Sequence, residues 1–178
     1  VPELSNKENL TSTFPLAPGI LACMMSHLGL MKIARKEGKE VICVFEDDII
    51  FCDDFNERIK YIEELQNFYF DILSLGGHFP NVTSMDGAAH NTPWNHIYQI
   101  TSLNGTYGYI ITAKAMDFCI RNLTYMWGID QFFGDQLYRR FKSMSFVPFL
   151  VGVRPCKSEI TGSFSKWENT KYFYQQEK

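Results

Sequence analysis

Apolar residues follow helical and strand spacings in alternation along the first half of the chain. Residues 20–36 place apolar side chains three or four positions apart and end in basic residues before a glycine, which predicts an amphipathic helix with a glycine C-cap. Residues 54–68 repeat the helical spacing. Residues 41–45 and 72–75 are short, wholly apolar runs. Such runs predict strands buried on both faces of a mainly parallel sheet.

The second half of the chain continues the alternation after a long segment rich in turn residues. Residues 78–95 contain proline, glycine and several asparagines, which predicts a long loop after a strand that ends at a Gly-Gly pair. The spacing then predicts strands over 97–101, 107–112 and 146–153, and helices over 113–122 and 129–141. We therefore expect an α/β fold with a mixed, mainly parallel sheet flanked by helices. We expect the segments 1–18 and 161–178 to be an N-terminal arm and a C-terminal tail around a domain at 19–160.

The amino-acid composition indicates which cellular compartment and which class of binding partner to expect. With 46% hydrophobic residues, the 178-residue chain can bury a core of its own. A net charge of -3 without a basic cluster argues against nucleic acid as a partner, and no apolar run is long enough for a transmembrane segment. Five scattered cysteines without a C-x-x-C pair indicate thiols in a reducing compartment, and so a cytoplasmic location. Four N-x-T sequons, at Asn9, Asn81, Asn104 and Asn122, leave the lumen of the secretory pathway as the alternative.

The strongest chemical signal is the acidic triplet Glu46-Asp47-Asp48, which directly follows the predicted strand at 41–45. Ligand sites in open α/β sheets lie beyond the carboxyl ends of strands. Adjacent carboxylates repel one another, and a hard cation such as Mn²⁺ or Mg²⁺ relieves that repulsion while it bridges to phosphate oxygens. The triplet thus predicts a metal and diphosphate site. A solvated turn is the alternative, and metal-dependent phosphatases and nucleases also place acids after a strand.

Three segments together resemble glycosyltransferase family 25, which includes bacterial lipooligosaccharide galactosyltransferases and animal collagen galactosyltransferases. They are residues 22–27, residues 44–48 and residues 105–116, in that order. The resemblance spans about 19–160. It implies a GT-A-like fold that binds nucleotide sugars, and an inverting, Mn²⁺-dependent hexosyltransferase in lipopolysaccharide or other glycan biosynthesis. The implied partners are a UDP-sugar, usually UDP-galactose, and a glycan or glycoprotein acceptor.

Carried over by position, the resemblance assigns each site residue a role. Asp48 and Asp47 would hold the metal, and Glu46 and Asp47 would lie near the ribose and sugar. Ser26, His27, Gly105 and Thr106 would contact the donor. Asp130, in an apolar-Asp element, would deprotonate the acceptor hydroxyl, with Asp135 as the second candidate. Residues 158–160 resemble a later Ser-Asp-Ile element, although glutamate stands at 159 where aspartate is usual.

Several assignments have plainer alternatives. His27 lies near the apolar stripe of its helix and could be a packing residue, and Asp130 could be a helix N-cap. Gly105 and Gly108 could serve turn geometry alone. His78, His90 and His96 are expected to meet substrate or solvent rather than metal. The family opens with a strand and an arginine-bearing turn that we do not find before residue 18, so a non-catalytic sugar- or nucleotide-binding module is the alternative function.

Overall fold

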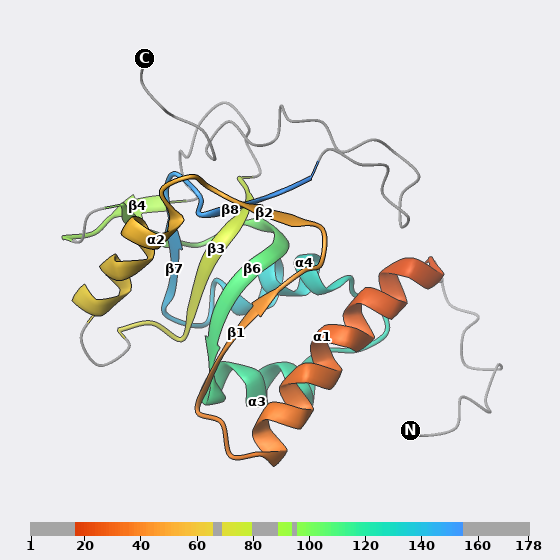
Figure 1. The fold of residues 1–178 in the computed structure, drawn as a ribbon. Coiled ribbons are helices and arrows are strands. Elements are labelled where there is room, and N and C mark those ends of the chain that lie inside the picture. Colours follow the sequence, from red (N-terminus) through yellow and green to blue (C-terminus); the bar gives the residue numbers. More distant parts are fainter. Residues whose placement is uncertain (1–16, 66–68, 80–88, 94–95, 155–178) are drawn as a thin grey trace, which may run out of the picture.

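The computed structural model describes residues 17–65, 69–79, 89–93 and 96–154, and these residues form an α/β fold (Figure 1). A six-stranded sheet has the order β1-β6-β3-β7-β5-β4, and β2 pairs with β8 in a separate two-stranded ribbon. The strands are β1 (Val41–Phe45), β2 (Ile49–Phe51), β3 (Ile72–His78), β4 (Ala89–Asn91), β5 (Ile97–Ile100), β6 (Asn104–Thr112), β7 (Ser143–Phe146) and β8 (Val151–Val153).

The expected α/β class is confirmed, but the expectation of a mainly parallel sheet is wrong. Only the β3–β7 pair is parallel, and the other four neighbouring pairs of the six-stranded sheet are antiparallel. The reason is that β6 inserts between β1 and β3 and runs opposite to both. Consequently β1 and β3 still point the same way, and their carboxyl ends share one edge of the sheet with the amino end of β6.

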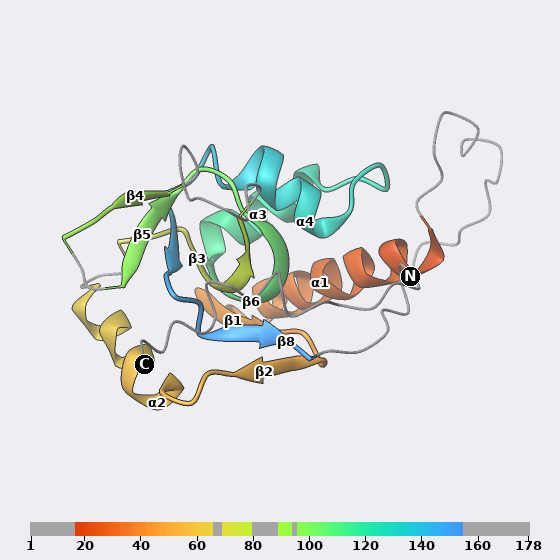
Figure 2. The ribbon, with the colours of Figure 1, turned by 90° about the horizontal axis from the view of Figure 1, so that it is seen from above.

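Helices cover one face of the sheet, and the β2–β8 ribbon crosses the other (Figure 2). The helices on that face are α1 (Pro18–Lys36), α3 (Ala113–Asn122) and α4 (Ile129–Phe132). The last of these continues as a π-helical turn at Phe133–Leu137. The Arg35 guanidinium joins α1 to α3 by donating to Asp117 at 3.0 Å. No helix in the described residues combines the length and apolarity needed to cross a bilayer.

Two predicted helices are shorter than their periodicity indicated. The helix expected at 54–68 is a single α turn, α2 (Phe55–Arg58), followed by a 3₁₀ segment at Ile59–Glu64. The helix expected at 129–141 consists of a short α-helix and a π-helical turn that ends at Leu137, and turns follow at 138–140. The helices expected at 20–36 and 113–122 are confirmed, because their apolar stripes pack against each other and the sheet.

Opposed glycines allow the β2–β8 ribbon to lie close to the sheet. Gly76 pairs with Gly108 across β3 and β6, and a Cβ at Gly108 would lie 2.8 Å from Val151 Cγ2. The expectation that Gly76 would end its strand is therefore wrong: β3 runs on to His78 because the missing side chain makes room for β8. The single strand expected at 146–153 is instead β7 and β8, which belong to different sheets. Part of the loop expected at 78–95 is β4, and residues 80–88 and 94–95 lie outside the described residues.

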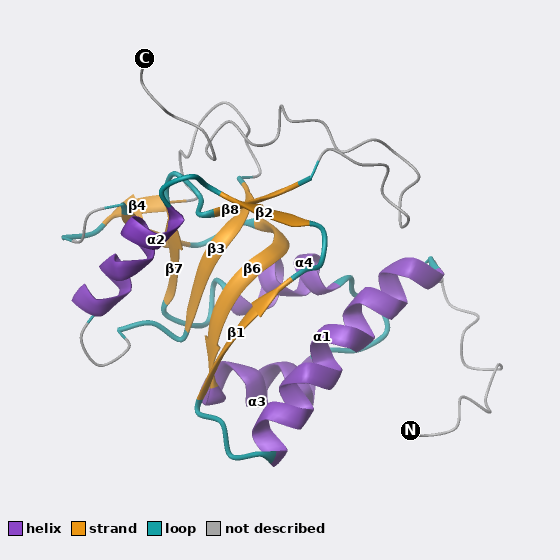
Figure 3. Cartoon of the chain, viewed as in Figure 1, coloured by secondary structure: helices purple, strands orange, loops and turns teal. Residues whose placement is uncertain are grey.

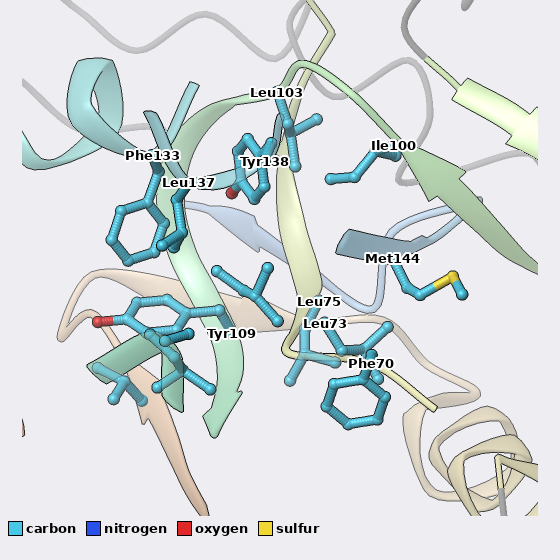
Figure 4. Packing of buried hydrophobic residues seen from close by; sticks show 14 of the residues in the cluster. Phe70, Leu73, Leu75, Ile100, Leu103, Tyr109, Phe133, Leu137, Tyr138 and Met144 are labelled. Atoms are coloured by element: carbon cyan, nitrogen blue, oxygen red, sulfur yellow. The ribbon is translucent and has the colours of Figure 1, made fainter. Parts of the chain in front are cut away.

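The core lies between the sheet and the helices (Figure 4). Leu73 and Leu75 from β3 are fully buried, as are Phe133 and Leu137 from the π-helical turn, while Tyr109 from β6 meets Phe133 edge to face at 5.1 Å. β1 differs from the expectation of burial on both faces, because it forms the edge of the sheet and only Val44 is buried.

Candidate functional site

One edge of the sheet gathers polar side chains from three strands. Glu46 follows the last residue of β1, His78 ends β3, and Thr106 and Tyr107 lie near the start of β6. The register brings them together, since Phe45 pairs with Gly108 and His78 pairs with Asn104. The acidic triplet occupies the loop that joins β1 to β2, drawn in teal in Figure 3. The acidic triplet therefore follows the carboxyl end of a strand, as the sequence predicted.

Glu46 is held on the inner side of this loop. Its Oε1 accepts a hydrogen bond of 2.7 Å from the buried Thr106 hydroxyl, and its backbone amide donates to Tyr107 O at 3.0 Å. His27 Nε2 lies 3.6 Å from the same Oε1. Burial alone would raise the pKa of Glu46, but the approach of His27 and the Thr106 bond outweigh it and lower the pKa. Glu46 is thus a fixed, ionised carboxylate at neutral pH.

His27 lies on α1, with its side chain almost fully buried between the helix and β6. Its Nδ1 is 2.8 Å from the Tyr109 hydroxyl, and the two rings stack with centroids 5.7 Å apart. His27 therefore packs in the core, as the packing alternative expected, and it also approaches Glu46. Its contact with a donor stays a prediction.

Asp48 presents a buried oxygen that lacks a hydrogen bond. Its Oδ1 has no partner among the described residues, although its backbone carbonyl accepts from Arg154 N at 2.9 Å. Burial and the charges of Glu46 and Asp47 raise the pKa of Asp48. An acceptor left unpaired in this way costs about 1–3 kcal/mol, and a cation would recover that energy. Asp48 fits a metal ligand for this reason.

The three acidic side chains do not form a cage around one ion. Asp47 is exposed, Glu46 turns toward α1, and in the described part of the chain the triplet does not bring three carboxylate oxygens within 4.8 Å of one another. A hard cation that also binds phosphate needs only one or two protein carboxylates. The binding of such an ion by Asp48 and Asp47 stays a prediction, and Glu46 does not complete the set.

Asp130 is the second residue of α4, whose N-cap is Gly128. The N-cap alternative for Asp130 is therefore wrong, although its Oδ1 accepts a 2.8 Å hydrogen bond from Gln131 N in the same turn. Burial, the Glu46 charge and then the Asp130 charge raise the pKa of Tyr107 to about 12. Asp130 thus acts electrostatically on the same edge of the sheet as Glu46.

The other predicted site residues differ in how near they lie to Glu46. Thr106 donates a hydrogen bond directly to Glu46. Gly105, the residue before Thr106, has a φ of 78°, a left-handed conformation that favours glycine. Ser26 is exposed and donates to Ala22 O of its own helix at 3.0 Å. Gly108 lies within β6 rather than in a turn, and it allows Val151 of β8 and Phe45 of β1 to pack closely against that strand. Exposed positions are taken by Asp135, His90 and His96, and residues 158–160 lie outside the described residues.

The sequence did not predict the contacts that His78 and Cys23 make at this edge. His78 was assigned to a loop, but as the end of β3 its Nδ1 lies 3.2 Å from the Tyr107 hydroxyl. Burial lowers the pKa of His78, and this effect outweighs the negative charge of Asp130, which would raise it. Cys23 lies one helical turn before His27 and belongs to the same cluster as Glu46. The Cys-x-x-x-His spacing was the signal that could have identified it.

A comparison with models of protein families identifies the same family as the three sequence motifs. The sequence model described as "Glycosyltransferase family 25 (LPS biosynthesis protein)" matches residues 3–133, which is most of the chain. The match includes the acidic triplet, the glycine-containing start of β6 and Asp130. A search of curated proteins found no match.

Proposed function

The chain belongs to glycosyltransferase family 25, and from that premise we propose that it transfers a hexose from a UDP-sugar to a glycan or glycoprotein acceptor. Galactose is the proposed sugar, and inversion at the anomeric carbon is the proposed stereochemistry, as the family resemblance implies. The biosynthesis of lipopolysaccharide or a related glycan is the proposed setting. We propose a cytoplasmic location, which the free thiols of Cys23, Cys43, Cys52 and Cys119 support.

The buried Oδ1 of Asp48, which has no hydrogen-bond partner among the residues that the structure describes, is the observation that carries this proposal. Asp48, assisted by the exposed Asp47, would hold Mn²⁺ or Mg²⁺ against the diphosphate of the donor. The cation would stabilise the negative charge that develops on the departing UDP. Glu46, fixed by Thr106, would remain on the inner side of the loop and orient the donor.

Asp130 is the proposed general base. As the acceptor oxygen attacks the anomeric carbon, its proton would pass to the Asp130 carboxylate, and the bonding electrons of the C–O bond would leave with UDP. The influence of Asp130 on Tyr107 and His78 supports a position facing the same site. Gln131 N, which donates to Asp130 Oδ1, would hold the carboxylate in one orientation.

The test is nucleotide release from a panel of UDP-sugars, with and without Mn²⁺ and with glycan and glycopeptide acceptors. We expect UDP release from UDP-galactose that depends on both the cation and the acceptor. Product analysis by NMR should show an anomeric configuration opposite to that of the donor. Saturable UDP binding without transfer to any acceptor would support the non-catalytic binding module instead, and absence of both would overturn the proposal.

A further inference from the structure

A cysteine, a histidine and a carboxylate converge on the inner side of the acidic loop. Cys23 and His27 are one turn apart on α1, so their side chains lie on the same face of the helix. Glu46 approaches that face from the end of β1. The candidate ligand atoms of the three residues, one from each, all lie within 4.8 Å of one another, and no other such trio occurs among the described residues.

The distance between His27 and Glu46 is that of two ligands of one metal ion. Nε2 and Oε1 are 3.6 Å apart, which is too far for a hydrogen bond. Zn²⁺ bonds of about 2.0–2.2 Å at a tetrahedral angle place nitrogen and oxygen ligands about 3.4 Å apart. A thiolate sulfur, with a bond of about 2.3 Å, fits at a slightly larger separation.

Second contacts hold two of the three ligands in place. His27 Nδ1 meets the Tyr109 hydroxyl at 2.8 Å, and when Nδ1–H donates to it, the Nε2 lone pair faces Glu46. The Thr106 hydroxyl donates to Glu46 Oε1 at 2.7 Å and leaves the carboxylate further acceptor capacity. Ligating histidines and carboxylates in metal sites carry outer hydrogen bonds of this kind, which fix the tautomer and the orientation.

We propose that Cys23, His27 and Glu46 bind a thiophilic divalent cation of the Zn²⁺ class, at a position separate from the hard-cation site at Asp48 and Asp47. Three protein ligands leave the fourth tetrahedral position to water or another small ligand. The Cys23 thiol loses its proton to solvent as the sulfur–metal bond forms. Carboxylates favour Mn²⁺ and Mg²⁺, whereas a thiolate and an imidazole select Zn²⁺ and Co²⁺, so the two sites differ in metal preference.

The charges around Cys23 favour a cation. Burial and the negative charges of Glu46, Asp130 and Asp48 raise the pKa of the Cys23 thiol to about 11. The same negative potential attracts a divalent ion, whose charge stabilises the thiolate. This site does not depend on the proposed transfer reaction, because its three ligands all come from the protein itself.

Co²⁺ is the probe for the first experiment, because a cobalt–thiolate bond gives a sulfur-to-metal charge-transfer band. The reduced full chain is titrated with Co²⁺ and then with Zn²⁺. We expect one equivalent of Co²⁺ to produce the band together with the visible absorption of a tetrahedral ion, and Zn²⁺ to abolish both. Cys23→Ser should lose the band, whereas the matched control Cys43→Ser, at an exposed cysteine on β1, should keep it. An unchanged band in Cys23→Ser, or no band in the wild type, would overturn the proposal.

The second experiment needs no variant and so is independent of whether Cys23→Ser folds. Wild-type protein is treated with a thiol-alkylating reagent with and without Zn²⁺, and modification of each cysteine is followed by mass spectrometry. We expect Zn²⁺ to slow alkylation of Cys23 at least tenfold and to leave Cys43 unaffected. Equal rates with and without Zn²⁺ at Cys23, or equal slowing at both cysteines, would contradict the site.

Discussion

Replacing Asp48 with asparagine separates metal binding from folding. Asparagine keeps the size of the side chain but removes the charge that faces Glu46 and Asp47. Those charges, with burial, raise the pKa of Asp48, which means that its carboxylate destabilises the folded protein at neutral pH. We therefore expect the metal-free Asp48→Asn protein to be as stable as the wild type or more stable. Only the response to cation and nucleotide should be lost.

The expected size of that response follows from the buried oxygen. Pairing this Oδ1, which has no partner in the described part of the chain, with a cation recovers about 1–3 kcal/mol. Mass action gives a similar figure, since a ligand at 100 times its dissociation constant adds about 2.7 kcal/mol to the free energy of unfolding. For a chain of this length each kcal/mol shifts the melting temperature by about 2–4 °C. Wild-type Tm should thus rise by roughly 5–11 °C.

The assay is thermal unfolding with Mn²⁺, with UDP and with both, on the wild type, Asp48→Asn and a control. Asp53→Asn is the control because Asp53 is an exposed acid in the same stretch of chain but outside the triplet. Wild type and Asp53→Asn should show the full shift with both ligands, and Asp48→Asn should show almost none. Transfer activity should follow the same order. An undiminished Mn²⁺-dependent shift in Asp48→Asn would refute the assignment of Asp48 as the metal ligand.

The remaining predictions concern the base, the packing of the sheet and pH. Asp130→Asn should lower kcat in single-turnover transfer by roughly 10²–10⁴ without changing UDP affinity. The control Asp135→Asn should leave the transfer rate nearly unchanged. Equal activity of the two variants would exclude Asp130 as the base. Gly108→Ala places a methyl group 2.8 Å from a side-chain carbon of β8 and should cost about 1–3 kcal/mol in urea unfolding, while Gly29→Ala, with open space around it, should not destabilise. Burial lowers the pKa of His78 below its ordinary value of 6.5, so the folded state resists protonation and stability should fall as pH drops below 6.5. His78→Gln should flatten that decline, and an identical pH profile would show that another group causes it.

The sequence determined the elements whose signals are local. The apolar stripes of α1 and α3, the β-branched run of β1 and the place of the acidic triplet after that strand could all be predicted from neighbouring residues. These features depend on side-chain spacing within one segment, which periodicity reports directly. The family resemblance was also local in origin, since it rested on short motifs in a fixed order.

Only the tertiary structure decided how those segments pair and which side chains meet. An apolar run does not specify whether its neighbour runs parallel or antiparallel, so the insertion of β6 between β1 and β3 was not predictable. That insertion set the register that places Thr106 against Glu46, and extended β3 to bring His78 to Tyr107. The contact of Glu46 with His27 likewise required α1 to pack over β6. Contacts between residues distant in sequence depend on the docking of whole elements, because no local pattern records which neighbour a side chain will face.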